Sequence, residues 1–103
     1  MSRFRKVGNT VYTSGVTAKP GDVPTQIRNS FEKLRAVLSE AGSSFDKVVK
    51  VNIYLSDLSY REQYLNQIWN EYFGNLDSAP SRTTIECGLG ADVYVEIEMV
   101  ASL

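Results

Sequence analysis

The fold is decided by residues 79–101, which read Ala79-Pro-Ser-Arg-Thr-Thr-Ile-Glu-Cys-Gly-Leu-Gly-Ala-Asp-Val-Tyr-Val-Glu-Ile-Glu-Met-Val-Ala101. The pattern predicts two strands joined by a glycine-containing loop. The first strand begins after the proline, which suits the start of a strand but not its interior. Because side chains alternate across a strand, we expect Arg82, Thr84 and Glu96 on one polar sheet face. Cys87 is expected on the opposite, apolar face.

Five further elements are expected on the N-terminal side of this stretch. The turn Gly8-Asn9 predicts a hairpin, because both residue types tolerate the positive φ of tight hairpin turns. Asp22 is a good N-cap for a helix that Gly42 ends. Ser59 and Glu62 form a capping-box pattern for a second helix. Hydrophobic periodicity gives strands 3–7 and 10–14, a helix from 22 to 41, a strand 47–56 and a second helix ending near 73.

This order predicts the α+β class, as a two-layer ββαβαββ fold with two helices on one face of a mixed sheet. The other sheet face is then uncovered by helices. Its expected side chains are polar but rich in tyrosine: Tyr12, Ser14, Lys50, Asn52, Tyr54, Arg82, Thr84, Tyr94, Glu96 and Glu98. Antiparallel sheets often expose one face to solvent, whereas tyrosine content favours an interface. The sequence therefore leaves two possibilities, a face exposed to solvent or a face that forms an interface.

Composition limits the chemistry that this chain can perform. The 103 residues suit a single domain spanning 1–103. Eleven Lys and Arg against twelve Asp and Glu give a net charge of -1, which argues against nucleic acid or an anionic membrane as partner. The chain has no histidine and one cysteine, which excludes Ser-His-Asp catalysis and a zinc site of nitrogen and sulfur ligands. Cysteine usage and the lack of a long apolar run favour the cytoplasm.

Six segments together resemble the Rid/YjgF family of reactive intermediate deaminases, once described as L-PSP endoribonucleases. The resemblance rests on their order and spacing and covers nearly the whole chain. The segments are Gly8 through Gly15, Gln26 through Ser44, Val48 through Leu58, Asn66 through Phe73, Pro80 through Glu86, and Val95 through Ala101.

The resemblance implies a chorismate-mutase-like fold and a homotrimer with ligand clefts between neighbouring subunits. In deaminating members, the arginine matching Arg82 binds the carboxylate of a small 2-imino acid. Hydrolysis converts this substrate to a 2-oxo acid. The glutamate matching Glu96 positions or activates the attacking water. The residues that line or support the cleft match Ser14, Gly15, Asn66 and Thr84. The resemblance implies no metal and no organic cofactor.

The chemistry of these residue types agrees with the implied roles. A guanidinium is a planar fork that matches a carboxylate, and a carboxylate of suitable pKa can take a proton from water. Structural alternatives also exist for several of the residues. These are a surface ion pair of Arg82 with Glu86 or Glu96, a strand-end hydrogen bond of Ser14, a bracing role for Asn66 and a core position for Cys87.

Some positions depart from the family pattern. The N-terminal tyrosine of deaminating members is expected at or before Met1, the frequent cysteine is replaced by Thr84, and the loop 88–92 looks one residue short. The leading hypothesis is an imine deaminase. The second is a non-catalytic trimeric module that binds small carboxylates or a partner protein. RNA binding or cleavage comes third, because the charge balance and the absence of histidine oppose it.

Overall fold

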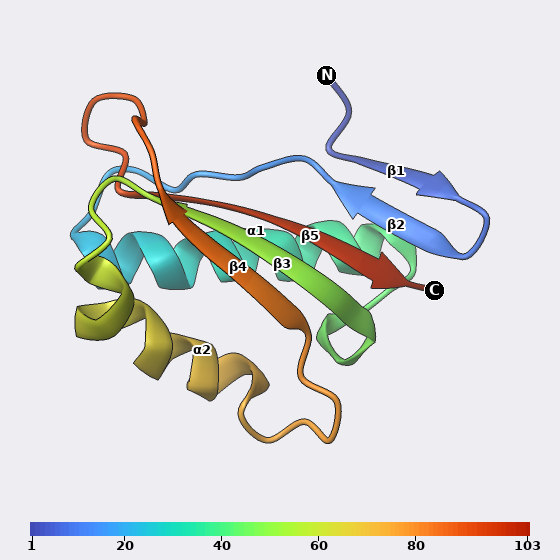
Figure 1. Cartoon of the computed structure of the whole chain (residues 1–103). Helices are drawn as coiled ribbons and strands as arrows, with labels where there is room; N and C mark the ends of the chain where they lie inside the picture. The colour runs from blue at the N-terminus through green and yellow to red at the C-terminus, as the bar shows by residue number, and fades with distance from the viewer.

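The computed structural model describes residues 1 to 103 (Figure 1). In chain order the elements are β1 (Phe4–Val7), β2 (Thr10–Thr13), α1 (Val23–Ala41), a 3-10 turn (Phe45–Lys47), β3 (Val48–Leu55), a π-helical turn (Arg61–Leu65), α2 (Asn66–Phe73), β4 (Ser81–Glu86) and β5 (Val95–Ser102). The predicted ββαβαββ order is confirmed. The apolar alternation of the last strand starts at Val93 in the sequence, but β5 begins two residues later, at Val95. The sequence also did not predict the π-helical turn.

The five strands form one mixed sheet in the order β1-β2-β5-β3-β4. β4 pairs in parallel with β3, and all other neighbours are antiparallel. β3 therefore lies between β4 and β5, although these two strands follow each other in the chain. Figure 1 shows their connection, drawn in orange to red, arching past the end of β3. This topology puts β4 at an edge of the sheet.

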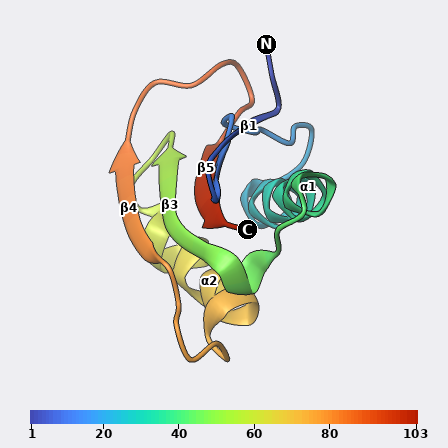
Figure 2. The same ribbon diagram turned by 90° about the vertical axis from the view of Figure 1, so that its right-hand side faces the viewer.

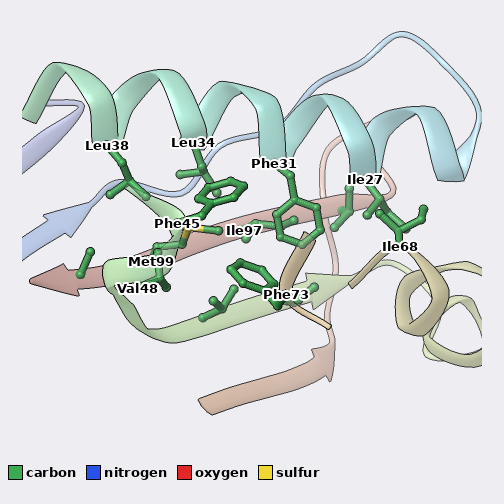
Figure 3. Packing of buried hydrophobic residues seen from close by; sticks show 14 of the residues in the cluster. Ile27, Phe31, Leu34, Leu38, Phe45, Val48, Ile68, Phe73, Ile97 and Met99 are labelled. Carbon is green, nitrogen blue, oxygen red and sulfur yellow. The ribbon is translucent and has the colours of Figure 1, made fainter. Parts of the chain in front are cut away.

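Both helices cover the same face of the sheet, as Figure 2 shows in the perpendicular view. Between the helices and the sheet lies one apolar core, in which Phe31 and Leu34 of α1 and Phe73 of α2 are fully buried (Figure 3). β5 contributes Ile97 and Met99 to the same core. Burying a side chain of this size contributes about 1.5–3 kcal/mol relative to exposure. None of the helices combines the length and the apolar character needed to span a bilayer.

The predicted ends of the first helix are confirmed. Asp22 is the N-cap of α1, and its Oδ1 accepts the N–H of Thr25 at 2.9 Å. Hydrogen bonds from Thr25 hold the pKa of Asp22 below its ordinary value. At the other end Gly42 adopts φ 89°, a left-handed conformation that glycine takes without strain.

The start of the second helix differs from the prediction. Ser59 and Glu62 do not form a capping box; instead the Oδ1 of Asp57 accepts the N–H of Ser59 at 2.9 Å. The chain then makes a π-helical turn, in which the N–H of Asn66 donates to the carbonyl of Arg61 five residues earlier. A capping box needs α-helical geometry from its first residue to the residue three positions later. The hydrogen bond from Ser59 to Asp57 and the wide turn that follows prevent this geometry between Ser59 and Glu62.

The face that β4 presents also differs from the prediction. Arg82 lies opposite Val51 of β3, and Thr84 lies opposite Ile53. Both partners are fully buried beneath the helices, and paired residues of neighbouring strands share a face. Arg82 and Thr84 therefore lie on the helix-covered face, not with Glu96 on the open face, the sheet face that carries no helix. The register with β3 decides this, because a shift of one residue moves every side chain to the other face.

Candidate functional site

Arg82 is held by two residues of α2. Its Nη2 donates to the Oδ1 of Asn66 at 2.8 Å, and its Cζ lies 5.1 Å from the centre of the Trp69 ring. Asn66 and Trp69 are three residues apart and so lie on one side of the helix. One hydrogen bond and one cation–π contact orient the guanidinium, while most of its five N–H donors make no bond within the chain.

No carboxylate of the chain neutralises Arg82. The ion pairs join Arg3 to Glu40, Arg28 to Glu71, Arg35 to Glu32 and Arg61 to Glu62. A surface ion pair of Arg82 with Glu86 or Glu96 is therefore wrong, and Glu86 instead accepts the N–H of Leu58 at 2.8 Å. Burial, and then the positive charge of Arg61, lower the pKa of Arg82. A partly buried cation without a counter-ion is suited to binding an anionic ligand.

Thr84 adds an unpaired hydroxyl on the same face of β4. Its Oγ1 is buried and has no hydrogen-bond partner within the chain. A buried polar group left without a partner costs about 1–3 kcal/mol, so this hydroxyl is an unmet hydrogen-bonding group on the face that carries Arg82. Arg82, Thr84, Asn66 and Trp69 together are called the arginine half-site below.

Glu96 lies on the open face of β5, opposite Tyr54 of β3. Gly15 packs directly against it, because a Cβ built on Gly15 would lie 2.6 Å from the Oε2 of Glu96. Two hydrogen bonds between Val16 and Ile97, of 2.9 and 3.1 Å, fix the chain at this point. Only glycine allows so close an approach of the backbone to the carboxylate.

Ser14 stands next to Gly15 and is anchored at the end of β2. Its hydroxyl donates to the carbonyl of Ser2 at 2.6 Å, and its N–H donates to the carbonyl of Arg3 at 2.9 Å. The hydroxyl thus makes the strand-end hydrogen bond that the sequence offered as an alternative role. Its oxygen can still accept a hydrogen bond. Ser14, Gly15 and Glu96 together are called the glutamate half-site.

A hollow of about 460 Å³ on the open face surrounds Glu96, a volume within the range of small-molecule sites. Its lining residues are Tyr54, Cys87, Gly88, Leu89, Gly90, Glu96 and Glu98. Tyr54 donates its hydroxyl to Glu98, and this hydrogen bond, together with burial, raises the pKa of Tyr54 to about 12. Glu98 is thereby engaged within the chain, and Glu96 is the carboxylate of the hollow that has no hydrogen-bond partner.

Cys87 lies in this hollow, and its predicted place in the core is wrong. The register puts Ile85 opposite Tyr54 on the open face, where Ile85 is 46% exposed. Cys87 follows two residues later on the same face and is partly buried. The same register that moves Arg82 beneath the helices therefore moves Ile85 and Cys87 out of the core.

The two half-sites are far apart within one chain. Arg82 is opposite Val51, which is itself opposite Met99, three residues along β5 from Glu96. At about 3.4 Å per residue and 4.8 Å between strands, the Cα atoms of Arg82 and Glu96 are roughly 14 Å apart, with side chains on opposite faces. A small molecule on Arg82 does not reach Glu96 of the same chain. The first half-site can hold a carboxylate, and the second can orient water and accept a proton.

Sequence reasoning missed two contributors to these half-sites. Trp69 was not among the candidate site residues, yet it stacks on Arg82; its spacing of three residues from Asn66 was the signal available. Tyr54 was placed on the correct face, but its bond to Glu98 depends on strand order, which the sequence does not display. No group of three or more Cys, Asp and Glu side chains is arranged to hold a metal ion.

Comparison with known proteins places the chain among close relatives over its whole length. The family model described as endoribonuclease L-PSP matches residues 2–103. A RutC family protein of Pyrococcus abyssi is 37% identical over 109 residues, which cover 97% of this chain and 84% of the relative. The Schizosaccharomyces pombe protein mmf2, named as mitochondrial, is 37% identical over 107 residues, covering 94% of this chain and 82% of the relative.

Solved structures share the fold closely. RidA from the Antarctic bacterium Psychrobacter sp. PAMC 21119 superposes with a TM-score of 0.91 at 31% identity, covering all (100%) of this chain and 88% of that one. YyfA of Yersinia pestis, described as a Rid family protein of unknown function, gives a TM-score of 0.92 at 28% identity, with 100% and 87% covered. The predicted fold class is therefore confirmed.

Proposed function

The chain belongs to the Rid/YjgF family, and from this premise we propose that it is an imine deaminase. Its substrates are small 2-imino acids such as 2-iminopropanoate and 2-iminobutanoate, which it hydrolyses to 2-oxo acids and ammonia. Arg82 binds the substrate carboxylate and Glu96 handles the water. Asn66, Thr84, Ser14 and Gly15 support these two groups. No cofactor is required by this chemistry.

The state of Arg82 is the observation that carries the proposal. Its guanidinium is partly buried, oriented by Asn66 and Trp69, and without a carboxylate partner in the chain. Burying a cation without compensation costs free energy, and structural ion pairs normally supply that compensation. The orphan hydroxyl of Thr84 lies on the same face. Both features fit a ligand that brings an anionic group with free oxygen lone pairs.

The reaction then needs only a positioned water. The Glu96 carboxylate accepts a proton as the water oxygen attacks the carbon of the C=N bond. Glu96 then returns the proton to the nitrogen, which gives a carbinolamine. In a second transfer Glu96 takes the proton of the new hydroxyl and delivers it to the amino group, so that the C–N bond breaks and ammonia leaves while the C=O bond of the 2-oxo acid forms. Imine and water are thus converted to oxo acid and ammonia with no other reactant. General base catalysis of this kind contributes about 10²–10⁴-fold.

The geometry of one chain favours a shared site. Because Arg82 and Glu96 lie on opposite sheet faces, the proposal requires the arginine half-site of one copy to meet the glutamate half-site of another. A cyclic homotrimer, as the family resemblance implies, brings such surfaces together repeatedly. The cytoplasmic location expected from the sequence stays a prediction, since one relative is named as mitochondrial.

The same separation favours a second candidate function. A chain whose copies do not juxtapose the half-sites retains a carboxylate-binding arginine without a nearby water-handling group. Such a protein binds small carboxylates and does not turn imines over. The two candidates therefore differ in turnover and not in carboxylate binding.

The test is release of ammonia and 2-oxo acid from 2-aminoacrylate, generated in situ by a serine dehydratase. We expect the wild-type protein to accelerate release, Arg82→Ala to lower kcat/KM by about 100-fold, and Glu96→Ala to lower kcat by at least about 100-fold. Arg28→Ala is the matched control, because Arg28 is an exposed arginine on α1 that pairs with Glu71 at 2.9 Å, away from both half-sites.

The variants separate the two candidate functions. Binding of 2-oxobutanoate by calorimetry should be lost in Arg82→Ala under either reading. Acceleration that Glu96→Ala removes supports the deaminase. A folded oligomer that binds 2-oxobutanoate but shows no acceleration contradicts the deaminase and leaves the carboxylate-binding protein.

A further inference from the structure

Arg61, in the π-helical turn that leads into α2, is a second cation beside the arginine half-site. We infer that Arg61 is a specificity-determining residue that selects 2-imino acids carrying a second carboxylate, such as 2-iminosuccinate. The inference rests on the proposed function, because it takes Arg82 as the group that binds the carboxylate next to the imine. It adds the chemical class of the preferred substrate.

The π-helical turn brings Arg61 to the side of the helix that carries Asn66. In a regular α-helix, residues five apart are separated by about 140° around the axis, because each residue turns about 100°. The wider turn, closed by the Asn66 N–H to Arg61 carbonyl bond, reduces this separation to about 50°. Asn66 accepts the hydrogen bond of Arg82. Arg61 therefore lies one π-helical turn before the residue that binds Arg82.

The positive charge of Arg61 reaches Arg82 and is poorly compensated. Burial, and then the positive charge of Arg61, lower the pKa of Arg82, in agreement with the position of Arg61 on the side of the helix that carries Asn66. The nearest carboxylate to Arg61 is Glu62, whose Oε1 lies 4.0 Å from its Nη2 and whose side chain is 80% exposed. By contrast, Arg28 and Glu71 approach to 2.9 Å. The half-site therefore presents two cations with little opposing charge.

A ligand with two negative groups compensates both cations, whereas a monocarboxylate compensates one. The first carboxylate binds Arg82 and the Thr84 side of the half-site, and the second, at the far end of a short side chain, binds Arg61. The reaction at the C=N bond is unchanged. Charge-assisted hydrogen bonds of this kind change affinity by roughly 10- to 100-fold.

The first test measures binding without turnover. Calorimetry compares 2-oxoglutarate, which carries two carboxylates, with 2-oxobutanoate, which carries one. We expect the wild-type protein to bind 2-oxoglutarate more tightly by about tenfold or more, and Arg61→Gln to bring this ratio close to one. Arg61→Lys retains part of the ratio, because it keeps the charge and loses the planar fork. Glu62→Gln is the matched control and should retain the full ratio.

The second test measures turnover of 2-iminosuccinate, generated by an L-aspartate oxidase, against 2-iminopropanoate. A ratio of kcat/KM values that favours the dicarboxylate in the wild type and falls in Arg61→Gln supports the inference. Equal affinity for the two oxo acids in the wild type, or an unchanged ratio in a folded Arg61→Gln protein, overturns it. If no imine is turned over but the binding ratio behaves as expected, the deaminase proposal fails while the role of Arg61 stands.

Discussion

Among single residues, Gly15 makes the sharpest steric prediction. Its Cβ position lies 2.6 Å from the Oε2 of Glu96, so Gly15→Ala should displace the carboxylate while costing little stability, because the far end of a flexible side chain moves. We expect kcat for imine hydrolysis to fall by roughly 100-fold, as misplacement of a reacting group by about 1 Å does. The measurement is kcat with 2-aminoacrylate, alongside thermal unfolding.

Gly88→Ala provides the matched control for this prediction. Gly88 lines the same hollow as Glu96, but a Cβ built there meets nothing within 4 Å. Its kcat should fall much less than that of Gly15→Ala, because the added methyl group does not displace the Glu96 carboxylate. Equal activity of Gly15→Ala and Gly88→Ala would show that the position of the Glu96 carboxylate is irrelevant to the reaction.

The sequence singled out the candidate residues, but it assigned Arg82 and Thr84 to the wrong face of the sheet. Arg82 was chosen because of its motif context, and its unpaired state and its contact with Asn66 fit that choice. Its face was assigned by assuming that β4 alternates in phase with β5. The two strands are separated by β3, and register with β3 depends on long-range packing that strand alternation does not report.

For whole elements, the contact between α1 and α2 makes a pH prediction. Tyr72 of α2 donates its hydroxyl to the Oε2 of Glu32 on α1 at 2.5 Å. Burial, and then this hydrogen bond, raise the pKa of Tyr72 to about 12, and the same bond lowers the pKa of Glu32. The tyrosine therefore stabilises the folded state fully below about pH 10 and loses that contribution as the pH rises toward 12. The glutamate contribution is present at neutral pH and is lost in acid.

Tyr72→Phe should remove both contributions. We expect the free energy of unfolding at neutral pH to fall by about 0.5–1 kcal/mol, at the lower end for a hydrogen bond because Glu32 is exposed. Its decline between about pH 10 and 12 should also be shallower than in the wild type. Urea unfolding across this range measures both. Tyr12→Phe, which removes an exposed hydroxyl that makes no hydrogen bond in the chain, should follow the wild-type curve.

The elements themselves were largely predictable because their ends carry local signals. Asp22 and Gly42 mark the ends of α1 through contacts within four residues, which a sequence displays directly. The start of the second helix was not predictable in the same way. Ser59 and Glu62 have the capping-box spacing, but Asp57 takes the Ser59 N–H, and the chain then widens into a π-helical turn. Two local patterns are possible there, the Ser59–Glu62 capping box and the Asp57 cap, and the sequence alone does not show which of them forms.

At the scale of the whole molecule, the open face of the sheet is the surface that fits the second copy required by the proposed function. It carries exposed apolar side chains at Val7, Tyr12 and Ile85, with exposed fractions of 62%, 48% and 46%. Apolar groups of this kind on a sheet face favour an interface. The hollow around Glu96 opens on this same face. Under the proposed function, a second copy on this face closes the hollow and brings its arginine half-site near Glu96.

Mixing two inactive variants tests this arrangement directly. Arg82→Ala and Glu96→Ala, each refolded alone from urea, should lack activity. Refolded together, they form mixed oligomers in which a shared site draws Arg82 from one copy and Glu96 from the next. With random mixing in a closed ring, about a quarter of the sites receive both intact residues, so about a quarter of wild-type activity should return. If Arg82 and Glu96 act from the same chain, no site is intact in any mixture, and the activity should stay absent at every mixing ratio.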